Sequence, residues 1–190
     1  MSSNTRQTII NGARACFFKH GFRASNMSMI SQFAGFSRVT LHKHFRNKER
    51  VFRAVCTDYQ TNCIKDCQQV LAQHTNCWDM IERITVSWNK SVFEEVSDNS
   101  VLRELLFEAS QVAQDIFEDA KKANRDILQA VLDKGLADSQ ISLQACQLNS
   151  EQLATMIVAC VNGIRSNYPK EQIHVACHQQ LTLFRLATQV

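Results

Sequence analysis

The side chains best suited to a specific chemistry lie in the short segment Arg38-Val39-Thr40-Leu41-His42-Lys43-His44, which follows a corner at Gly35. Arg38 and Lys43 carry positive charge, and an arginine can form two hydrogen bonds with the edge of a guanine base. A helix of this size fits the major groove of double-stranded DNA. The segment therefore predicts a helix whose polar face contacts base edges in an anionic duplex.

The residues around this segment have the spacing of a helix-turn-helix. Ile30 and Ala34 predict a short helix that ends at Gly35, because glycine adopts a positive φ at little cost in a tight corner. Ser37 is a suitable N-cap for the next helix, which we expect over residues 38–44. The corner fixes the angle at which the second helix can enter a groove.

Positive charge is concentrated at the start of the chain. Residues 1–50 contain nine lysines or arginines and one acidic residue, giving +8, whereas the other 140 residues contain 12 basic and 17 acidic side chains, giving −5. A basic segment of this kind favours a polyanionic partner. An acidic protein would also satisfy the charge, but it would leave the glycine corner and the groove-sized helix without an explanation.

The remainder of the sequence predicts more helices. Apolar residues recur at the helical spacing of 3.6, and with one proline, five glycines and no alternating strand pattern the fold class should be all-α. We expect a three-helix helix-turn-helix domain over residues 1–47 and a helical ligand-binding and dimerisation domain over residues 48–190, about nine helices in all. The expected helices cover residues 5–20, 27–34, 38–44, 48 to beyond 63, 77–96, 101–107, 112–134, 149 onward and 169 onward. We expect Gly21 to cap the first helix in the left-handed conformation, Asn47 to cap the fourth, and Asn149 to form a capping box with Gln152.

Several classes of protein are disfavoured. The sequence has no glycine-rich phosphate loop after a strand, no His-Glu-x-x-His and no Gly-x-Ser-x-Gly, so we predict that it is not an enzyme and needs no cofactor. It has no run of 18 apolar residues and no apolar secretory segment near the N-terminus, which predicts a cytoplasmic protein without membrane contact. The eight dispersed cysteines then predict reduced thiols.

Two sets of cysteine and histidine residues leave other roles open. His174, Cys177 and His178 stand at i, i+3 and i+4 on one predicted helix, a spacing that could bind zinc or another soft metal. Cys67, His74 and Cys77 form a looser set. Spacing alone is weak support, so no metal site is predicted, and a redox switch through one of the thiols is an alternative of similar weight.

Residues 15–52 resemble the N-terminal signature of the TetR family of transcriptional regulators. The matching residues are Phe17, Gly21, Phe22, Ile30, Ala34, Gly35, Ser37, Thr40, Leu41, Phe45, Lys48 and Glu49. The sequence departs at Ser31, where the family usually has alanine, and at His42, where a tyrosine commonly contacts a phosphate. The resemblance covers about a quarter of the chain.

This resemblance implies a homodimeric repressor that binds a near-palindromic DNA operator and is released by a small-molecule inducer, although activation of transcription stays open. We expect Arg38, Val39, Thr40 and Lys43 to contact base edges or neighbouring sugars. The residues expected to contact phosphates are Ser28, Ser37, His42, His44 and Lys48.

The same resemblance implies an inducer pocket and a dimer interface in the second domain. The expected pocket lining is Phe52, Cys56, Tyr59, Cys63, Trp88, Phe93, Phe107 and Phe117, although aromatic and sulfur side chains at helical spacing are more often plain core. The expected interface is Leu153, Met156, Ile157, Cys160, Val161, Ile164, Ile173, Leu181 and Phe184, with Gly163 allowing a close approach of helices. Packing of these residues inside their own protomer is the alternative.

Overall fold

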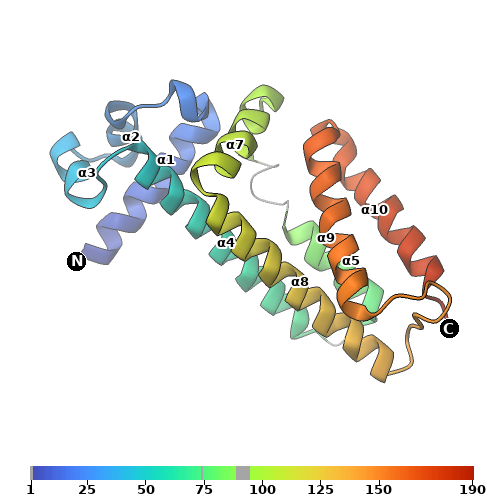
Figure 1. Ribbon diagram of the computed structural model, residues 1–190. Coiled ribbons are helices and arrows are strands. Elements are labelled where there is room, and N and C mark those ends of the chain that lie inside the picture. The colour runs from blue at the N-terminus through green and yellow to red at the C-terminus, as the bar shows by residue number, and fades with distance from the viewer. Residues whose placement is uncertain (1, 74, 89–94) are drawn as a thin grey trace. The chain divides into compact units, whose positions relative to one another are not determined.

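The computed structural model describes residues 2–73, 75–88 and 95–190, and this part of the chain contains helices and no strand (Figure 1). All-α is therefore the fold class, as the sequence predicts. The helices are α1 (Ser2–Ala24), α2 (Met27–Ala34), α3 (Arg38–His44), α4 (Lys48–Leu71), α5 (Cys77–Ser87), α7 (Asn99–Val112), α8 (Gln114–Ala137), α9 (Ser150–Asn167) and α10 (Lys170–Ala187). Within these described ranges, none of the helices is long and apolar enough to cross a membrane.

The chain forms two compact units. The first unit contains residues 1–62 and 92–118, and the second contains residues 63–91 and 119–190. The first unit is larger than the predicted helix-turn-helix domain of residues 1–47, because α7 packs against α1 although the two helices are far apart in sequence. α4 and α8 each contribute residues to both units.

The core of the first unit forms around one face of α1. Ile9, Ile10 and Phe17 are fully or almost fully buried. The Phe17 ring makes an edge contact with the Phe52 ring at a centroid distance of 5.1 Å. The Phe22 ring also contacts Phe52, at a centroid distance of 4.7 Å. Aromatic pairs in this range stabilise a core beyond the area that they bury. The first turns of α4 are thereby fixed against α1.

Glycine allows α1 and α2 to cross closely. A Cβ atom built at Gly12 would lie 2.4 Å from the Cα and 2.8 Å from the Cβ of Ala34. Real Cβ atoms do not approach other carbons so closely, so only glycine fits at residue 12. The crossing places α2, and through the corner at Gly35 also α3, relative to the long first helix (Figure 1).

The caps predicted from local sequence are present. Gly35 ends α2 in the left-handed conformation (φ 70°, ψ 24°), and the Ser37 hydroxyl accepts a hydrogen bond from the Thr40 N–H. Asn47 accepts from the N–H of Arg50 at the start of α4. Gly21 also has a positive φ (78°), but its ψ of 168° differs from the left-handed cap predicted for it, and the helix assignment continues to Ala24.

The second unit has its core between α5, α9, α10 and the larger part of α8. Ile81, Ile84, Leu128, Leu132 and Ile157 are completely buried. The indole Nε1 of Trp78 donates to the Thr188 hydroxyl at 3.0 Å, which connects the start of α5 to the end of α10. α9 and α10 pack side by side (Figure 1).

Two predicted helices differ from the observed ones. The helix predicted over residues 77–96 is described only for Cys77–Ser87, since residues 89–94 lie outside the described part. α7 is longer than the predicted 101–107, because Asp98 caps it through the N–H groups of Ser100 and Val101. The capping box predicted for Asn149 and Gln152 is confirmed.

Candidate nucleic-acid interface

One buried residue orients the whole of α3. Leu41 is completely buried and attaches the helix to the core of the first unit. Successive helical residues are rotated by about 100°, so Val39 and Lys43 lie opposite Leu41, and Arg38 and His42 lie at the flanks of that face. All four side chains are exposed. The exposed side is polar apart from Val39, whose side chain is 67% exposed. A short helix with this face outward can enter a major groove.

Ser37 and Thr40 reinforce the start of α3. Besides accepting from the Thr40 N–H at 3.1 Å, the Ser37 hydroxyl lies 3.0 Å from the Thr40 hydroxyl. Thr40 is only partly exposed. The predicted contacts of Ser37 with a phosphate and of Thr40 with a base would therefore use hydroxyls that already hydrogen-bond to each other.

The start of α2 is capped by Asn26 and not by Ser28. The Asn26 carboxamide oxygen accepts from the N–H groups of Ser28 and Met29, both at 3.0 Å. The departure from the family pattern at Ser31 is accommodated, since this buried hydroxyl donates to the Ser28 carbonyl at 2.8 Å. Ser28 stays half-exposed at the first turn of α2, where a phosphate contact remains a prediction.

Lys48 has a partner that the sequence did not indicate. Its Nζ donates to the Phe22 carbonyl at 2.8 Å and to the Arg23 carbonyl at 3.4 Å, and it lies 4.2 Å from the centroid of the Phe22 ring. The ammonium therefore satisfies carbonyls at the end of α1. In this arrangement it connects α4 to α1, and the predicted phosphate contact is not the role that its geometry favours.

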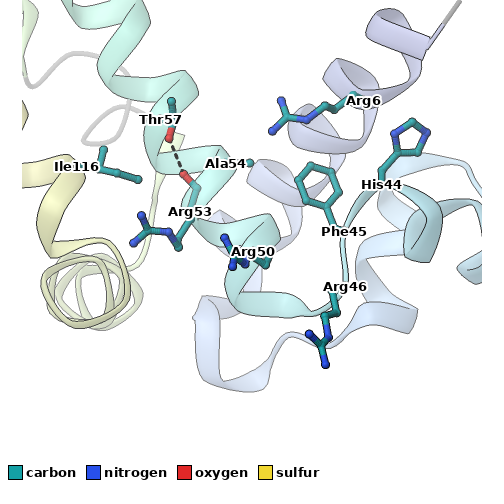
Figure 2. Close-up of a pocket in the computed structure, with 9 residues that line it drawn as sticks. All are labelled: Arg6, His44, Phe45, Arg46, Arg50, Arg53, Ala54, Thr57 and Ile116. Carbon is teal, nitrogen blue, oxygen red and sulfur yellow. Dashed lines mark hydrogen bonds between the residues drawn. The ribbon is translucent and has the colours of Figure 1, made fainter.

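A groove in the first unit is lined by several basic side chains for which the sequence predicted no role. It has a volume of about 570 Å³ and we call it the basic groove (Figure 2). Its lining comes from α1, the end of α3, the connection between α3 and α4, α4 itself and the start of α8: Arg6, His44, Phe45, Arg46, Arg50, Arg53, Ala54, Thr57 and Ile116. Of these, only His44 was predicted as a site residue; the high basic charge of residues 1–50 was the one signal for Arg6, Arg46 and Arg50.

Two arginines connect the helix-turn-helix to later helices of the same unit. Arg23 donates through its backbone N–H to Glu104 at 2.8 Å and through Nε to Glu108 at 2.7 Å. Arg53 donates to both carboxylate oxygens of Asp115 and to the Val112 carbonyl at 2.7 Å. The hydrogen bond from Arg53 holds the pKa of Asp115 at about 2, well below its usual range.

The residues predicted to line an inducer pocket are divided between the two units. Phe52 and Cys56 are buried in the first unit, where Tyr59 and Phe117 are half-buried, while Cys63 and Trp88 are buried in the second unit. Phe107 is 54% exposed and lies 5.8 Å from the Arg23 guanidinium. Phe93 lies outside the described residues. The pocket therefore stays a prediction.

More than half of the residues predicted for the dimer interface are core residues of their own unit. Leu153, Ile157, Val161, Ile173 and Leu181 are buried. Cys160, Ile164 and Phe184 are half-buried, and Met156 is exposed. The exposed apolar side chains of α10 are different ones, namely Val175, Leu183 and Leu186. Gly163 faces open space, because a Cβ built there would meet nothing within 4 Å.

The cysteines and histidines give little support to a metal site. The described ranges contain no group of three His, Cys, Asp or Glu side chains placed to bind a metal, and His74 lies outside them. His178 pairs with Glu82 at 2.6 Å. Burial raises the pKa of Cys56 to about 12 and that of Cys77 to about 11, which keeps both thiols protonated and unreactive at neutral pH.

Comparison with known proteins identifies the helix-turn-helix. Residues 9–55 match the model for bacterial regulatory proteins of the tetR family. The HTH-type transcriptional repressor AcnR from Corynebacterium glutamicum is 36% identical over 56 residues, which is 30% of this chain and 30% of AcnR. A repressor from Mycobacterium tuberculosis, Rv1474c, is 34% identical over 53 residues. The chain thus matches less than a third of the length of these curated relatives.

Solved structures share the fold over nearly the whole chain. A TetR transcription regulator from Haloarcula marismortui has a TM-score of 0.82 at 16% identity, covering 99% of this chain and all of that one. SmeT, the repressor of the Stenotrophomonas maltophilia multidrug efflux pump SmeDEF, has a TM-score of 0.73 at 19% identity, covering 97% of this chain and 90% of SmeT. SmeT has also been solved as a complex with triclosan.

These findings describe an all-α protein whose N-terminal helix-turn-helix matches the model for bacterial regulatory proteins of the tetR family. The match to the tetR-family model is confined to residues 9–55, and the fold is that of solved TetR regulators. The family consists of transcriptional regulators and not of enzymes.

Proposed function

We propose that this protein is a sequence-specific DNA-binding regulator of transcription, acting in the cytoplasm as a homodimeric repressor that a small-molecule inducer releases from its operator. The observation that carries the proposal is the exposed face of α3, which buried Leu41 turns outward. The tetR-family match over residues 9–55 and the repressor relatives support it.

The exposed face of α3 suggests how bases are distinguished. Arg38 is exposed at the first turn of the helix, where a guanidinium can pair with the O6 and N7 atoms of guanine. Val39 can form only apolar contacts, and the thymine methyl group is the apolar feature of the major groove. Lys43 lies one to two turns later and is exposed, so it can contact a base or a neighbouring phosphate.

A second copy of the chain is needed to place two such helices on one operator. Exposed Met156 on α9 and exposed Val175, Leu183 and Leu186 on α10 give an apolar surface that a partner could cover. Gly163 would let the helix of a partner approach closely. Two recognition helices in a dimer would lie about 34–36 Å apart or somewhat more, which requires a near-palindromic site.

Release by a small molecule rests on coupling between units. SmeT binds triclosan in a solved complex, which supports a ligand-responsive second domain in this chain as well. A ligand lowers the affinity of the protein for its operator only to the extent that it binds the conformation unable to bind DNA more tightly than the DNA-binding conformation. An operator affinity that no compound in a broad library changes would contradict this part of the proposal.

Fluorescence anisotropy with duplex DNA tests the function. The probe is the DNA upstream of the gene for this protein, with a shuffled duplex of the same composition as control, at several salt concentrations. Specific sites bind about 10³–10⁷ times more tightly than random DNA. Equal and weak binding of both duplexes would contradict recognition of this upstream site.

A further inference from the structure

The basic groove defined above carries more positive charge than its own unit neutralises. Arg6, Arg46 and Arg50 are exposed, and in the described part of the chain none of them forms an ion pair with a carboxylate. Arginine presents several N–H donors in a fixed plane and pairs readily with phosphate or carboxylate. The groove is therefore suited to an anion.

Neighbouring acidic residues do not compensate this charge. Asp115, next to the groove residue Ile116, gives both carboxylate oxygens to Arg53. Asp58, next to the groove residue Thr57, accepts a hydrogen bond from the neutral amide of Gln7 at 2.8 Å and, among the described residues, forms no ion pair with an arginine of the groove. Arg53 is thereby paired, while the other three arginines keep their donors for a ligand.

The groove also has apolar lining. The Phe45 ring lies 5.1 Å from the Arg6 guanidinium carbon at one side, half-buried Ile116 lies at the other, and Ala54 lies between them (Figure 2). The α4 residues that line it run from Arg50 to Thr57, about 10 Å at the helical rise of roughly 1.5 Å per residue. A volume of about 570 Å³ is in the range of sites for small molecules.

We propose that the basic groove is a binding site for a small organic anion with at least two negative charges, whose acidic groups pair with Arg6, Arg46 and Arg50 and whose carbon part packs on Phe45 and Ile116. Binding of a DNA backbone would need only the positive charge at the end of the groove nearest α3. The groove extends from His44 along α4 to α8, and this favours a ligand with its own compact shape.

Occupancy of the groove would affect DNA binding, a consequence that rests on the proposed function. His44 is the last residue of α3 and Arg46 follows two residues later, so an anion bound here neutralises charge beside the recognition helix. A bound anion would then weaken DNA binding, most strongly at low salt where phosphate attraction is largest.

Isothermal titration without DNA tests the site itself, so that its failure is distinguishable from a failure of DNA recognition. The probes are ATP without magnesium and tripolyphosphate, at constant ionic strength. We expect saturable binding of both, with ATP the tighter because its base adds an apolar surface. Arg50→Gln and Arg46→Gln should each weaken binding about tenfold, as expected for loss of a charge-assisted pair.

Arg103→Gln is the matched control, because Arg103 is exposed on α7 of the same unit and does not line the groove. The Arg103→Gln variant should bind both probes with the affinity of the wild type. Thermal unfolding should show that this variant and the Arg46→Gln and Arg50→Gln variants are all folded. Three outcomes would overturn the proposal: no saturable binding of either probe, equal losses in the Arg103 variant, or variants that lose only DNA affinity. Equal affinity for the two probes would overturn the role of the apolar lining.

Discussion

The backbone of α2 at Ala34 lies so close to Gly12 that a Cβ on residue 12 would stand 2.4 Å from the Ala34 Cα. The nearest atoms are the Cα and N of α2, which cannot move without displacing the helix. This contact fixes where the helix-turn-helix begins relative to α1.

Gly12→Ala should therefore destabilise the protein although alanine is the better helix former. Helix propensity alone would stabilise by up to about 1 kcal/mol, but overpacking a close contact costs about 1–3 kcal/mol. With both terms at their full size, we expect a net loss of up to about 2 kcal/mol in urea unfolding. Asn11→Ala, at an exposed neighbouring position, is the control and should be neutral or stabilising. A stabilised Gly12→Ala variant would show that the helices do not cross this closely.

Lys48→Met should lower stability and leave the salt dependence of DNA binding unchanged. The ammonium donates to the Phe22 carbonyl, and loss of a half-buried charged hydrogen bond should cost about 1–2 kcal/mol. A phosphate contact would instead contribute about one unit to the slope of log K against log salt. Lys43→Met is the comparison, with a slope reduced by about one and unchanged stability. A reduced slope in the Lys48 variant would restore the phosphate role.

The pair Arg53–Asp115 should give a stability difference that depends on pH. The folded-state pKa of Asp115 is lowered to about 2, whereas the pKa of an unfolded aspartate is about 3.9. The contribution is therefore fully present above about pH 4 and disappears as the pH falls through about 2. Urea unfolding of Asp115→Asn and wild type should differ at pH 7 and converge near pH 2. Asp119→Asn, an exposed neighbour on α8, should match the wild type throughout; a pH-independent difference for Asp115→Asn would contradict the pairing.

The double substitution Val175→Lys and Leu186→Lys should convert a dimer into a monomer. The two residues are 11 positions apart, which places them on the same face of α10, and both are more than half exposed in the single chain. Sedimentation velocity should show the smaller species for the double variant. Val86→Lys changes an exposed apolar residue of α5 in the same unit and should stay dimeric. An unaffected dimer in the double variant would move the interface elsewhere.

The parts of this structure that sequence predicts well are local ones. Gly35, Ser37, Asn47 and the pair Asn149–Gln152 act through atoms within three or four residues, so the residue type and its position are enough to identify the cap. The outward face of α3 is equally predictable, because one buried residue on a short helix determines which of the other side chains point outward.

Contacts between distant segments are what the sequence could not supply. Nothing near Lys48 indicates that its partner is the carbonyl of Phe22, or that Arg53 pairs with a carboxylate 62 residues later. The apolar periodicity of a helix also identifies the face that is buried, but it does not show whether that face packs on its own unit or on a second copy. Leu153, Ile157 and Val161 are therefore in the core of their own unit, although the pattern equally suited a contact with a second copy.

The most direct test of sequence recognition by α3 is the ratio of affinities for operator and shuffled DNA in wild type and in Arg38→Lys, measured by anisotropy at one salt concentration. Lysine keeps the charge but loses the paired hydrogen bonds to guanine, so discrimination should fall by ~1–3 kcal/mol. The ratio of affinities should then fall about 5-fold to more than 100-fold, while affinity for shuffled DNA hardly changes. An unchanged ratio would contradict base recognition by Arg38, and an equal loss on both duplexes would mean that Arg38 contacts only the backbone.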